Sequence, residues 1–204
     1  MKRLNEKKID DAKYYEKIWS EEFNTRPYYD AVRMRALIRN VKNGDSVMDI
    51  GAGVFGACQY IAEKTALKCN LFAYDQSYTA KEIVNRVAPQ IDYQLGECAG
   101  RLPFDDNSFD VVMAGEVIEH MEDPASFCAE LCRISRQWVS LSTVDTNSYN
   151  ARKHGDYPEH IWEFTPQDLV SFFEPFGIVT YQVVGDYHFI YFMKHLTMRE
   201  YPRP

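Results

Sequence analysis

Short apolar runs alternate with amphipathic segments along most of this chain. From residue 46 onward, five apolar runs have the length and composition of strands, at 46–50, 70–74, 91–95, 109–114 and 138–142. Segments whose apolar residues have helical spacing lie between them, at 55–64, 79–87 and 124–135. Strands that alternate with helices predict an α/β fold, in which helices cover both faces of a parallel sheet.

The end of the chain predicts one more helix and two closely spaced strands. Residues 165–168 supply an N-cap, a proline at the first helical position and an acidic residue, so a helix should begin there and end before Gly177. Apolar runs at 178–184 and 188–193 are separated by three residues, which favours an antiparallel hairpin. The sheet is therefore predicted to be mostly parallel and to end in an antiparallel strand.

Two helices are predicted before the first strand. Apolar and aromatic residues recur on one face over 9–23, and a second helix should cover 28–40, before the turn signal at residues 43 and 44. We expect residues 1–43 to form a helical cap on a globular unit that spans 44–204. The cap is open to three interpretations: a lid over a ligand, a plain packing helix or an oligomer contact.

Composition narrows the class of protein. Of the 204 residues, 46% are hydrophobic, which suits a globular chain and is too many for a disordered one. No apolar core follows the N-terminal residues 1–8, so we expect no secretory signal, and no apolar run is long enough to predict a membrane-spanning helix. Five cysteines without a CxxC pair disfavour a disulfide framework or a zinc knuckle and fit a cytoplasmic protein.

Charge is unevenly distributed along the chain. Residues 1–45 carry 11 Lys and Arg against 8 Asp and Glu, whereas residues 46–204 carry 12 against 22. A nonspecific grip on nucleic acid needs clustered cations, so the acidic body makes a nucleic-acid partner unexpected. The basic N-terminal arm leaves local contacts with such a partner open. The oligomeric state does not follow from the sequence.

The residues that follow each strand are the candidates for a binding site, because ligands bind at the carboxyl ends of the strands in such sheets. After the first strand, Gly51, Gly53 and Gly56 let the backbone approach a ligand closely before a helix begins. Asp75 follows the second strand at the spacing of an acid that accepts hydrogen bonds from a ribose diol. Glu97 follows the third strand and can accept from an adenine amino group.

The acidic residues distinguish between two classes of nucleotide. A dinucleotide cofactor places its pyrophosphate at the helix N-terminus. Here Asp49 lies two residues before the first glycine, and Glu97 and Glu116 follow other strands, so a ring of carboxylates would repel pyrophosphate. Such a site suits a cationic nucleoside without phosphate, and S-adenosylmethionine has that character.

With these motifs in order, the sequence resembles the class I S-adenosylmethionine-dependent methyltransferases over roughly residues 28–193. The resemblance rests on the segments Val47–Gly53, Tyr74–Asp75, Gly96–Glu97, Leu102–Val112, Glu116–His120 and His160–Pro166. It implies a Rossmann-like, seven-stranded, mostly parallel sheet with an antiparallel last strand and helices on both faces. It also implies that residues 44–204 form the S-adenosylmethionine-binding domain, and that the cofactor is bound by Asp49, Gly51, Ala52, Gly53, Asp75, Gln76, Glu97, Cys98, Glu116 and Val117.

Two histidines are candidates for the chemistry. Methyl transfer needs the acceptor held in line with the methyl group, and an oxygen or nitrogen acceptor also has to lose a proton. Histidine titrates near neutral pH, and His120 and His160 follow the fourth and fifth strands. We expect both to act at the acceptor, with Glu119 orienting His120. Aromatic residues could line the pocket or pack in the core: Tyr14, Tyr15, Trp19, Tyr28, Tyr149, Tyr157 and Trp162.

A divalent metal site is a second interpretation of the same residues. Glu116, Glu119 and His120 have a spacing that places three ligand-capable groups on one helical face, and His160 can add a fourth. The set resembles the metal site of small-RNA terminal ribose methyltransferases and of some quinone O-methyltransferases. Metal-free relatives carry a similar motif, so a divalent metal is possible but not favoured, and its ligands are left unassigned.

The sequence therefore favours an enzyme that transfers a methyl group from S-adenosylmethionine to an oxygen or nitrogen of a small molecule or of a glycan or lipid intermediate. Two alternatives stay open. One is a metal-assisted RNA ribose methyltransferase, which the acidic body disfavours. The other is a non-catalytic, methyltransferase-like subunit that binds a partner, against which the intact Asp49, Gly51, Gly53 and Asp75 argue.

Overall fold

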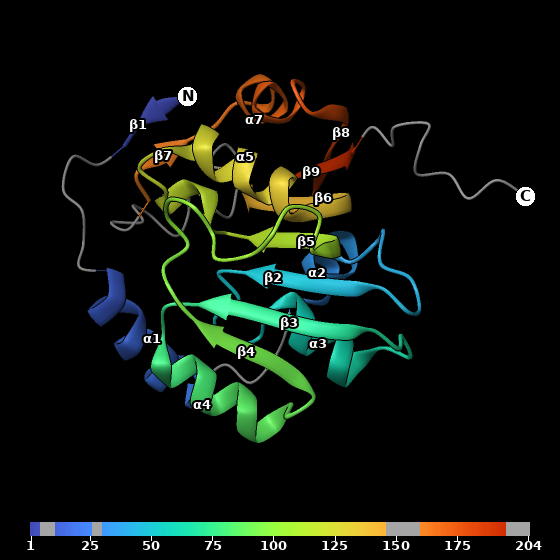
Figure 1. Cartoon of the computed structure of the whole chain (residues 1–204). Helices are drawn as coiled ribbons and strands as arrows, with labels where there is room; N and C mark the ends of the chain where they lie inside the picture. Colours follow the sequence, from blue (N-terminus) through green and yellow to red (C-terminus); the bar gives the residue numbers. More distant parts are fainter. Residues whose placement is uncertain (5–10, 26–29, 146–159, 195–204) are drawn as a thin grey trace, which may run out of the picture.

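A seven-stranded sheet forms the centre of the protein (Figure 1). The structure is a computed structural model, and it describes residues 1–4, 11–25, 30–145 and 160–194. The strands follow the order β4-β3-β2-β5-β6-β9-β8. Their bounds are β2 Ser46–Ile50, β3 Asn70–Asp75, β4 Ile91–Leu95, β5 Phe109–Gly115, β6 Ser135–Val144, β8 Gly177–Val184 and β9 Tyr187–Lys194.

Strand direction confirms the predicted α/β, Rossmann-like class. The pairs from β4 through β6 are parallel, and β9 is antiparallel to both of its neighbours, β6 and β8. The predicted hairpin at the end of the chain is therefore present. Because β2 to β6 run in one direction, their carboxyl ends meet along one edge of the sheet, at the arrowheads in Figure 1.

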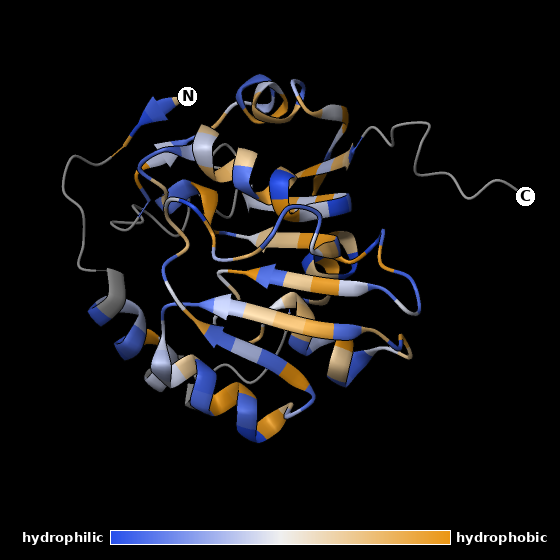
Figure 2. Ribbon diagram, in the orientation of Figure 1, coloured by the Kyte–Doolittle hydropathy of each residue, from blue (hydrophilic) through white to orange (hydrophobic). Residues whose placement is uncertain are grey.

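Side chains on each strand point alternately to the two faces of the sheet, and helices cover both faces. Val47 packs with helices α2, α3 and α4 on one face, whereas Met48 and Ile50 pack with α5 and α7 on the other. Figure 2 shows the apolar strands of the centre against the polar outer faces of the helices. The helices are α1 Asp11–Thr25, α2 Ala31–Leu37, α3 Ala57–Lys64, α4 Tyr78–Val87, α5 Pro124–Ile134 and α7 Pro166–Phe173.

Capping residues fix where these helices begin. At the start of α5, Asp123 is the N-cap before Pro124, and its carboxylate accepts from the Ser126 N–H. At the start of α7, Thr165 and Asp168 form a reciprocal capping box. Both predicted helix starts are therefore confirmed. The helix predicted over 28–40 is shorter than expected. Asp30 accepts from the Val32 and Arg33 N–H groups, so α2 begins at Ala31 and ends at Leu37.

Three short elements escaped the sequence patterns. A two-stranded antiparallel sheet joins β1 (Lys2–Arg3) to β7 (Trp162–Glu163), and a single 3-10 turn, η1, covers Ile118–His120. β6 also begins three residues before the predicted 138. Elements of two or three residues leave no periodicity to detect. Within the described ranges, no helix combines the length and apolar character that crossing a membrane requires.

Candidate functional site

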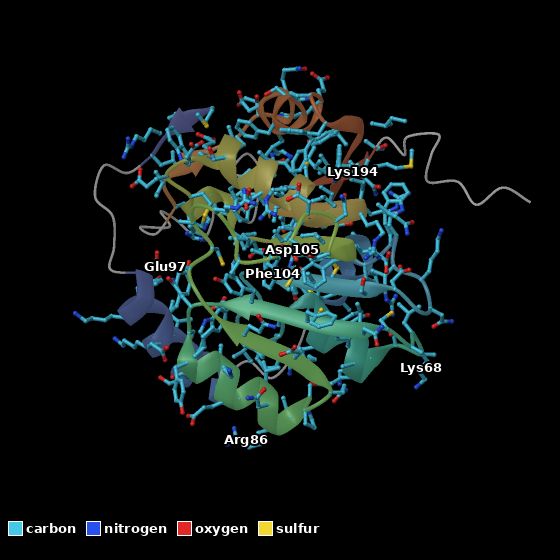
Figure 3. All side chains as sticks on the ribbon, in the orientation of Figure 1. Lys68, Arg86, Glu97, Phe104, Asp105 and Lys194 are labelled. Carbon is cyan, nitrogen blue, oxygen red and sulfur yellow. The ribbon has the colours of Figure 1, made fainter. Side chains whose placement is uncertain are left out.

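A cavity of about 950 Å³ opens at the carboxyl edge of the sheet. Its wall contains every site residue predicted from the sequence except Gly53 and Glu119. Figure 3 labels Glu97 at this edge, beside α1, and Lys68 at the opposite edge of the sheet. Six residues from α1 and α2 also line the cavity: Tyr15, Ile18, Trp19, Arg33, Met34 and Leu37.

The glycine loop lies closely packed under the cavity. Gly51 and Gly53 both have positive φ, at 69° and 49°, a conformation that disfavours residues with a side chain. A Cβ on Gly51 would collide with Val117, and one on Gly53 would collide with Trp19. The loop is therefore glycine-rich for two reasons, its backbone conformation and the side chains that pack directly on it.

Asp49 faces the helix that follows the loop. Its Oδ2 accepts from the Cys58 N–H at 3.0 Å, and the side chain is almost fully buried. Burial raises the pKa of Asp49 to about 6, while backbone N–H groups and the charge of Arg33 work in the opposite direction. Asp49 thus holds the start of α3 against the glycine loop in addition to lining the cavity.

Asp75 ties two ligand-facing segments together. Its Oδ2 accepts from the Gly53 N–H at 3.0 Å, and its Oδ1 accepts from the Ser77 N–H at 2.8 Å. Burial raises the pKa of Asp75, opposed by these N–H groups. Each carboxylate oxygen can accept more than one hydrogen bond, so Asp75 retains capacity for a ribose diol in the cavity.

Residues that follow β3 and β4 form the third side of this region. Gln76, Glu97 and Cys98 line the cavity, and the Glu97 side chain is exposed at its mouth. Burial and the charge of Asp75 raise the pKa of the Cys98 thiol, so it stays protonated at neutral pH. The thiol is a neutral surface against which an apolar ring can lie.

An ion pair that the sequence analysis missed closes the opposite side. Arg33 of α2 pairs with Glu116, and its guanidinium lies over the Tyr187 ring at 5.4 Å. Glu116 has a positive φ of 59°, so it does not continue into η1 and does not share a helical face with Glu119. The helical grouping predicted for Glu116, Glu119 and His120 is therefore wrong.

The two predicted histidines meet beside the cavity. The ring centroids of His120 and His160 are 5.0 Å apart, and the Tyr15 hydroxyl lies 3.3 Å from both ring nitrogens of His120. Burial lowers the pKa of His160 to about 3, and the neighbouring His120 adds to the effect. His160 is therefore neutral at physiological pH.

Glu119 lies behind the histidines rather than in the cavity wall. Its side chain is 1% exposed, and burial raises its pKa to about 7, opposed by His120. One ligand atom from each of Glu119, His120 and His160 lies within 4.8 Å of the others, a grouping that could hold a metal ion. Glu116, the fourth residue of the metal interpretation, pairs with Arg33 instead.

Helix α1 contacts three parts of this edge (Figure 1). Trp19 packs on Gly53, and Tyr15 reaches His120. The Glu16 carboxylate accepts from the Tyr78 and Thr79 N–H groups, at 2.6 and 3.0 Å, and thereby caps the start of α4. Of the aromatic residues predicted as pocket wall, Tyr15 and Trp19 line the cavity, Tyr14 and Trp162 do not, and Tyr28, Tyr149 and Tyr157 lie outside the described residues.

The first residues of the chain hold the segment that carries His160. The Leu4 N–H donates to the Ile161 carbonyl, and the Ile161 N–H donates to the Glu119 carbonyl, each at 2.8 Å. Arg3 lies over the Trp162 ring, and the Trp162 indole N–H donates to the Met121 carbonyl at 2.8 Å. The position of His160 relative to Glu119 is thus fixed by backbone contacts on both sides.

This geometry agrees with a comparison of the sequence with protein families. Residues 48–138 match the family described as a methyltransferase domain. The match runs from β2 to the middle of β6 and so contains the glycine loop, Asp75, Glu97, Glu116 and the histidine of η1.

Curated relatives are similar over part of their length. A protein of Oryza sativa named "Probable tocopherol O-methyltransferase, chloroplastic" is 29% identical over 64% of this chain and 42% of its own length. Norajmaline N-methyltransferase of Rauvolfia serpentina is 29% identical over 46% of this chain and 33% of its own length. The chain therefore aligns with less than half of either relative.

A solved structure shares the fold over most of both chains. An S-adenosylmethionine-dependent methyltransferase of Thermotoga maritima aligns with a TM-score of 0.67 at 16% identity, and the alignment covers 88% of this chain and 98% of that one. At this identity the likeness shows the fold alone.

Proposed function

We propose that the protein is an S-adenosylmethionine-dependent methyltransferase that acts on an oxygen or nitrogen atom of a small molecule. The observation that carries the proposal is the charge of the cavity. Asp49, Asp75, Glu97 and Glu116 line it, and among the described residues of the wall Arg33 bears the one permanent positive charge, which Glu116 already pairs. A cationic, phosphate-free nucleoside matches this lining, whereas a pyrophosphate does not.

Strand order gives the direction in which the nucleoside would lie. β4, β3, β2 and β5 are neighbours, so Glu97, Asp75, the glycine loop and Glu116 follow one another along the edge. Adenine fits beside Gln76 and the Cys98 thiol, and Asp75 accepts from the ribose hydroxyls. The sulfur then lies over the glycine loop, with the histidines on the acceptor side.

S-adenosylmethionine supplies an activated methyl group on a sulfonium, so the protein has to hold the acceptor in line and receive its proton. We assign the proton to His120, which lines the cavity within reach of the Tyr15 hydroxyl. His160 is less suited to this role because burial keeps its pKa far below neutrality. It instead forms a neutral wall that keeps His120 in place.

The size and lining of the cavity favour a small acceptor. Its volume of about 950 Å³ is in the usual range for a small-molecule site and leaves room beside a nucleoside. Ile18, Met34 and Leu37 make the side above the glycine loop apolar. The curated relatives include methyltransferases of tocopherol and of an alkaloid, which supports an apolar acceptor. The contacts of α1 with the glycine loop, α4 and His120 support its role as a lid.

The ribose assignment is tested by binding. Isothermal titration with S-adenosylhomocysteine should show that Asp75→Ala weakens affinity about 10- to 100-fold, as expected from the loss of hydrogen bonds to a charged acceptor. Asp75→Asn, which retains one oxygen acceptor, should lose less. Asp92→Ala is the control, because Asp92 is an exposed carboxylate on β4 outside the cavity wall. Unchanged affinity in Asp75→Ala would refute the assignment.

The transfer itself is tested by a screen. Purified protein with S-adenosylmethionine is offered phenols, hydroquinones and tertiary or secondary amines, and released S-adenosylhomocysteine is measured. Turnover of at least one class is expected. If the wild-type protein binds neither S-adenosylmethionine nor S-adenosylhomocysteine at up to about a millimolar, the enzyme proposal fails and a non-catalytic binding subunit is the better description.

A further inference from the structure

Tyr15 of α1 extends into the cavity as far as the proposed proton acceptor. Its side chain lines the cavity, and its hydroxyl lies 3.3 Å from both ring nitrogens of His120. The two rings meet edge to face, with centroids 5.9 Å apart and planes at 88°. A hydroxyl next to an imidazole is the arrangement from which a proton passes to histidine, and such contacts are often slightly long until a reaction complex tightens them.

The Tyr15 ring is also stacked with Trp19, which covers the glycine loop. The centroids of these two rings are 6.1 Å apart and their planes meet at 22°, an offset stack. Trp19 lies so close to Gly53 that a Cβ on this glycine would come within 2.4 Å of its ring. The phenol of Tyr15 therefore lies between the aromatic cover of the glycine loop and the imidazole of His120.

This is the place that the proposed reaction requires for the methyl acceptor. The sulfur is proposed to lie over the glycine loop, and His120 is proposed to receive the proton. The loop follows β2 and His120 follows β5, and these two strands are neighbours in the sheet. An acceptor held in line with the methyl group has to lie between the loop and the imidazole. Tyr15 holds a flat ring with a hydroxyl there.

The Tyr15 side chain can leave this place while helix α1 stays docked. The Glu16 carboxylate caps the start of α4, and Trp19 packs on Gly53. Both contacts are made by other side chains of the same helix. A change of rotamer at Tyr15 would therefore clear the space between Trp19 and His120 without undocking the helix.

We propose that the methyl acceptor is a phenol, and that Tyr15 is an internal stand-in for it, which the acceptor displaces. The inference rests on the proposed function and narrows its acceptor from an oxygen or nitrogen atom to the hydroxyl of a flat ring. The ring of the acceptor takes the place of the Tyr15 ring on Trp19, and its hydroxyl takes the place of the Tyr15 hydroxyl at His120.

The transfer then balances with the groups already named. The O–H bond of the phenol breaks and its proton goes to His120. The oxygen forms a bond to the methyl carbon, and the electron pair of the broken S–C bond returns to the sulfur. The products are an aryl methyl ether and S-adenosylhomocysteine.

An internal stand-in competes with every phenol that enters the site. The apparent affinity of the wild type is lowered by the fraction of time that Tyr15 fills the site. The probes are p-cresol, which has the structure of the tyrosine side chain, and benzylamine, a ring of similar size with an ammonium group. In isothermal titration with S-adenosylhomocysteine at saturation, Tyr15→Ala should bind p-cresol about 10-fold more tightly than the wild type, because a competing hydrogen bond and ring stack are lost. The affinity for benzylamine should change less than about threefold.

Two further variants complete the binding test. Tyr14→Ala is the matched control, because Tyr14 contacts the Tyr15 ring edge-on at 5.3 Å but lies outside the cavity wall, and it should leave both affinities within about threefold. Tyr15→Phe removes only the hydroxyl, so it should gain about threefold for p-cresol and provides the test if Tyr15→Ala does not fold. Its kcat should stay within about threefold of the wild type, and a loss of about 10-fold or more would show that Tyr15 takes part in the transfer and would overturn the inference.

The identity of the product is a second, independent test. The wild type and Tyr15→Ala are given S-adenosylmethionine with equal amounts of p-cresol and benzylamine, and the products are identified by mass spectrometry. The methyl ether of p-cresol is the expected product, with a lower KM for p-cresol in Tyr15→Ala. N-methylbenzylamine as the main product, or no product from a protein that binds S-adenosylhomocysteine, would overturn the inference.

The outcomes separate this inference from the proposed function. If Tyr15→Ala gains no affinity for p-cresol, or gains as much for benzylamine, Tyr15 is a packing residue of the lid and the inference is overturned. The proposed function still stands in that case, because S-adenosylhomocysteine binding is measured separately. If the wild type binds neither S-adenosylmethionine nor S-adenosylhomocysteine, the proposed function fails and the inference with it.

Discussion

The cavity has two halves that are built in different ways. The half where the nucleoside of the proposed cofactor would lie, called the nucleoside half, is made by Asp49, the glycine loop, Asp75 and Glu97. In it, Asp49 and Asp75 accept from backbone N–H groups near them in the chain. Asp49 and Cys58 are 9 residues apart, and Asp75 and Gly53 are 22 apart. The histidine half, made by Arg33, Glu116, Glu119, His120 and His160, relies on pairs such as Arg33–Glu116 and Tyr15–His120, which are 83 and 105 residues apart.

Because they are built differently, the two halves should respond differently to substitutions. A motif that satisfies its own backbone depends less on distant elements for its shape, although Trp19 and Val117 also pack on the glycine loop. The histidine half has its shape only when α1, α2, η1 and β7 are all docked. We therefore expect substitutions in one half to leave the properties of the other largely unchanged.

The largest effect is expected at His120. Once a methyl acceptor is identified, His120→Ala should lower kcat about 10²- to 10⁴-fold, because it removes the proposed proton acceptor, and should leave the affinity for S-adenosylhomocysteine within about threefold. His160→Ala should cost less, since burial keeps this imidazole from accepting protons.

His188→Gln is the control for the cost of altering a buried histidine. His188 is 4% exposed on β9 and contacts the Tyr181 hydroxyl at 2.8 Å outside the cavity wall. Steady-state kinetics measures kcat, and titration calorimetry measures cofactor affinity. If His120→Ala lowered both quantities in parallel, the two halves would not be independent.

A smaller effect is expected at the glycine loop. Gly51→Ala combines a positive φ of 69° with a collision against Val117, and should lower the free energy of unfolding by about 3 kcal/mol. Gly100→Ala has a similar φ of 74° but no atom within 4 Å of the added Cβ, so it should cost only about 1 kcal/mol.

Urea unfolding of the two glycine variants separates the cost of close packing from the cost of backbone conformation. If both variants lost the same free energy of unfolding, Val117 would have moved to accommodate the added methyl group.

The smallest effect is the pH dependence contributed by Asp49. Its pKa is near 6 in the folded protein and near 3.8 otherwise, so the folded state binds a proton more tightly than the unfolded chain. The contribution of Asp49 to the free energy of unfolding should therefore be greatest below about pH 4 and fall by about 2 kcal/mol up to about pH 6.

Asp49→Asn stays neutral and should lose this decline. Unfolding of the wild type and the variant at intervals from pH 4 to pH 8 measures the difference, with Asp92→Asn as the exposed control. A constant difference across this range would show that Asp49 ionises normally.

Sequence patterns predicted the nucleoside half and much of the fold. The strands of the parallel sheet have continuous apolar runs, and Asp75 follows one of them at a fixed distance from the glycine loop, so both are visible in local spacing. The helix starts at Pro124 and Pro166 were likewise visible, because a capping residue lies directly before each of them and bonds a residue three positions on.

The histidine half was predicted only in part. His120 and His160 were found because they follow strands, but their closeness to Tyr15 depends on the docking of α1, which no local pattern encodes. Arg33 was missed because one arginine in an amphipathic helix resembles any solvated cation. The sequence does hold one signal for Arg33: carboxylates are in excess at the predicted strand ends, so a positively charged partner is expected near them.

The hydrogen bond between Leu4 and Ile161 also sets an order of assembly. During synthesis β1 emerges before β7, so it lacks its partner strand until Trp162 and Glu163 have been translated. β2, β3 and β4 can pair as soon as residue 95 is free, and their short connections favour early pairing. Much of the nucleoside half can thus form while the rest of the sheet is still being made, and the segment that carries His160 is fastened later, by β1 residues made well before it.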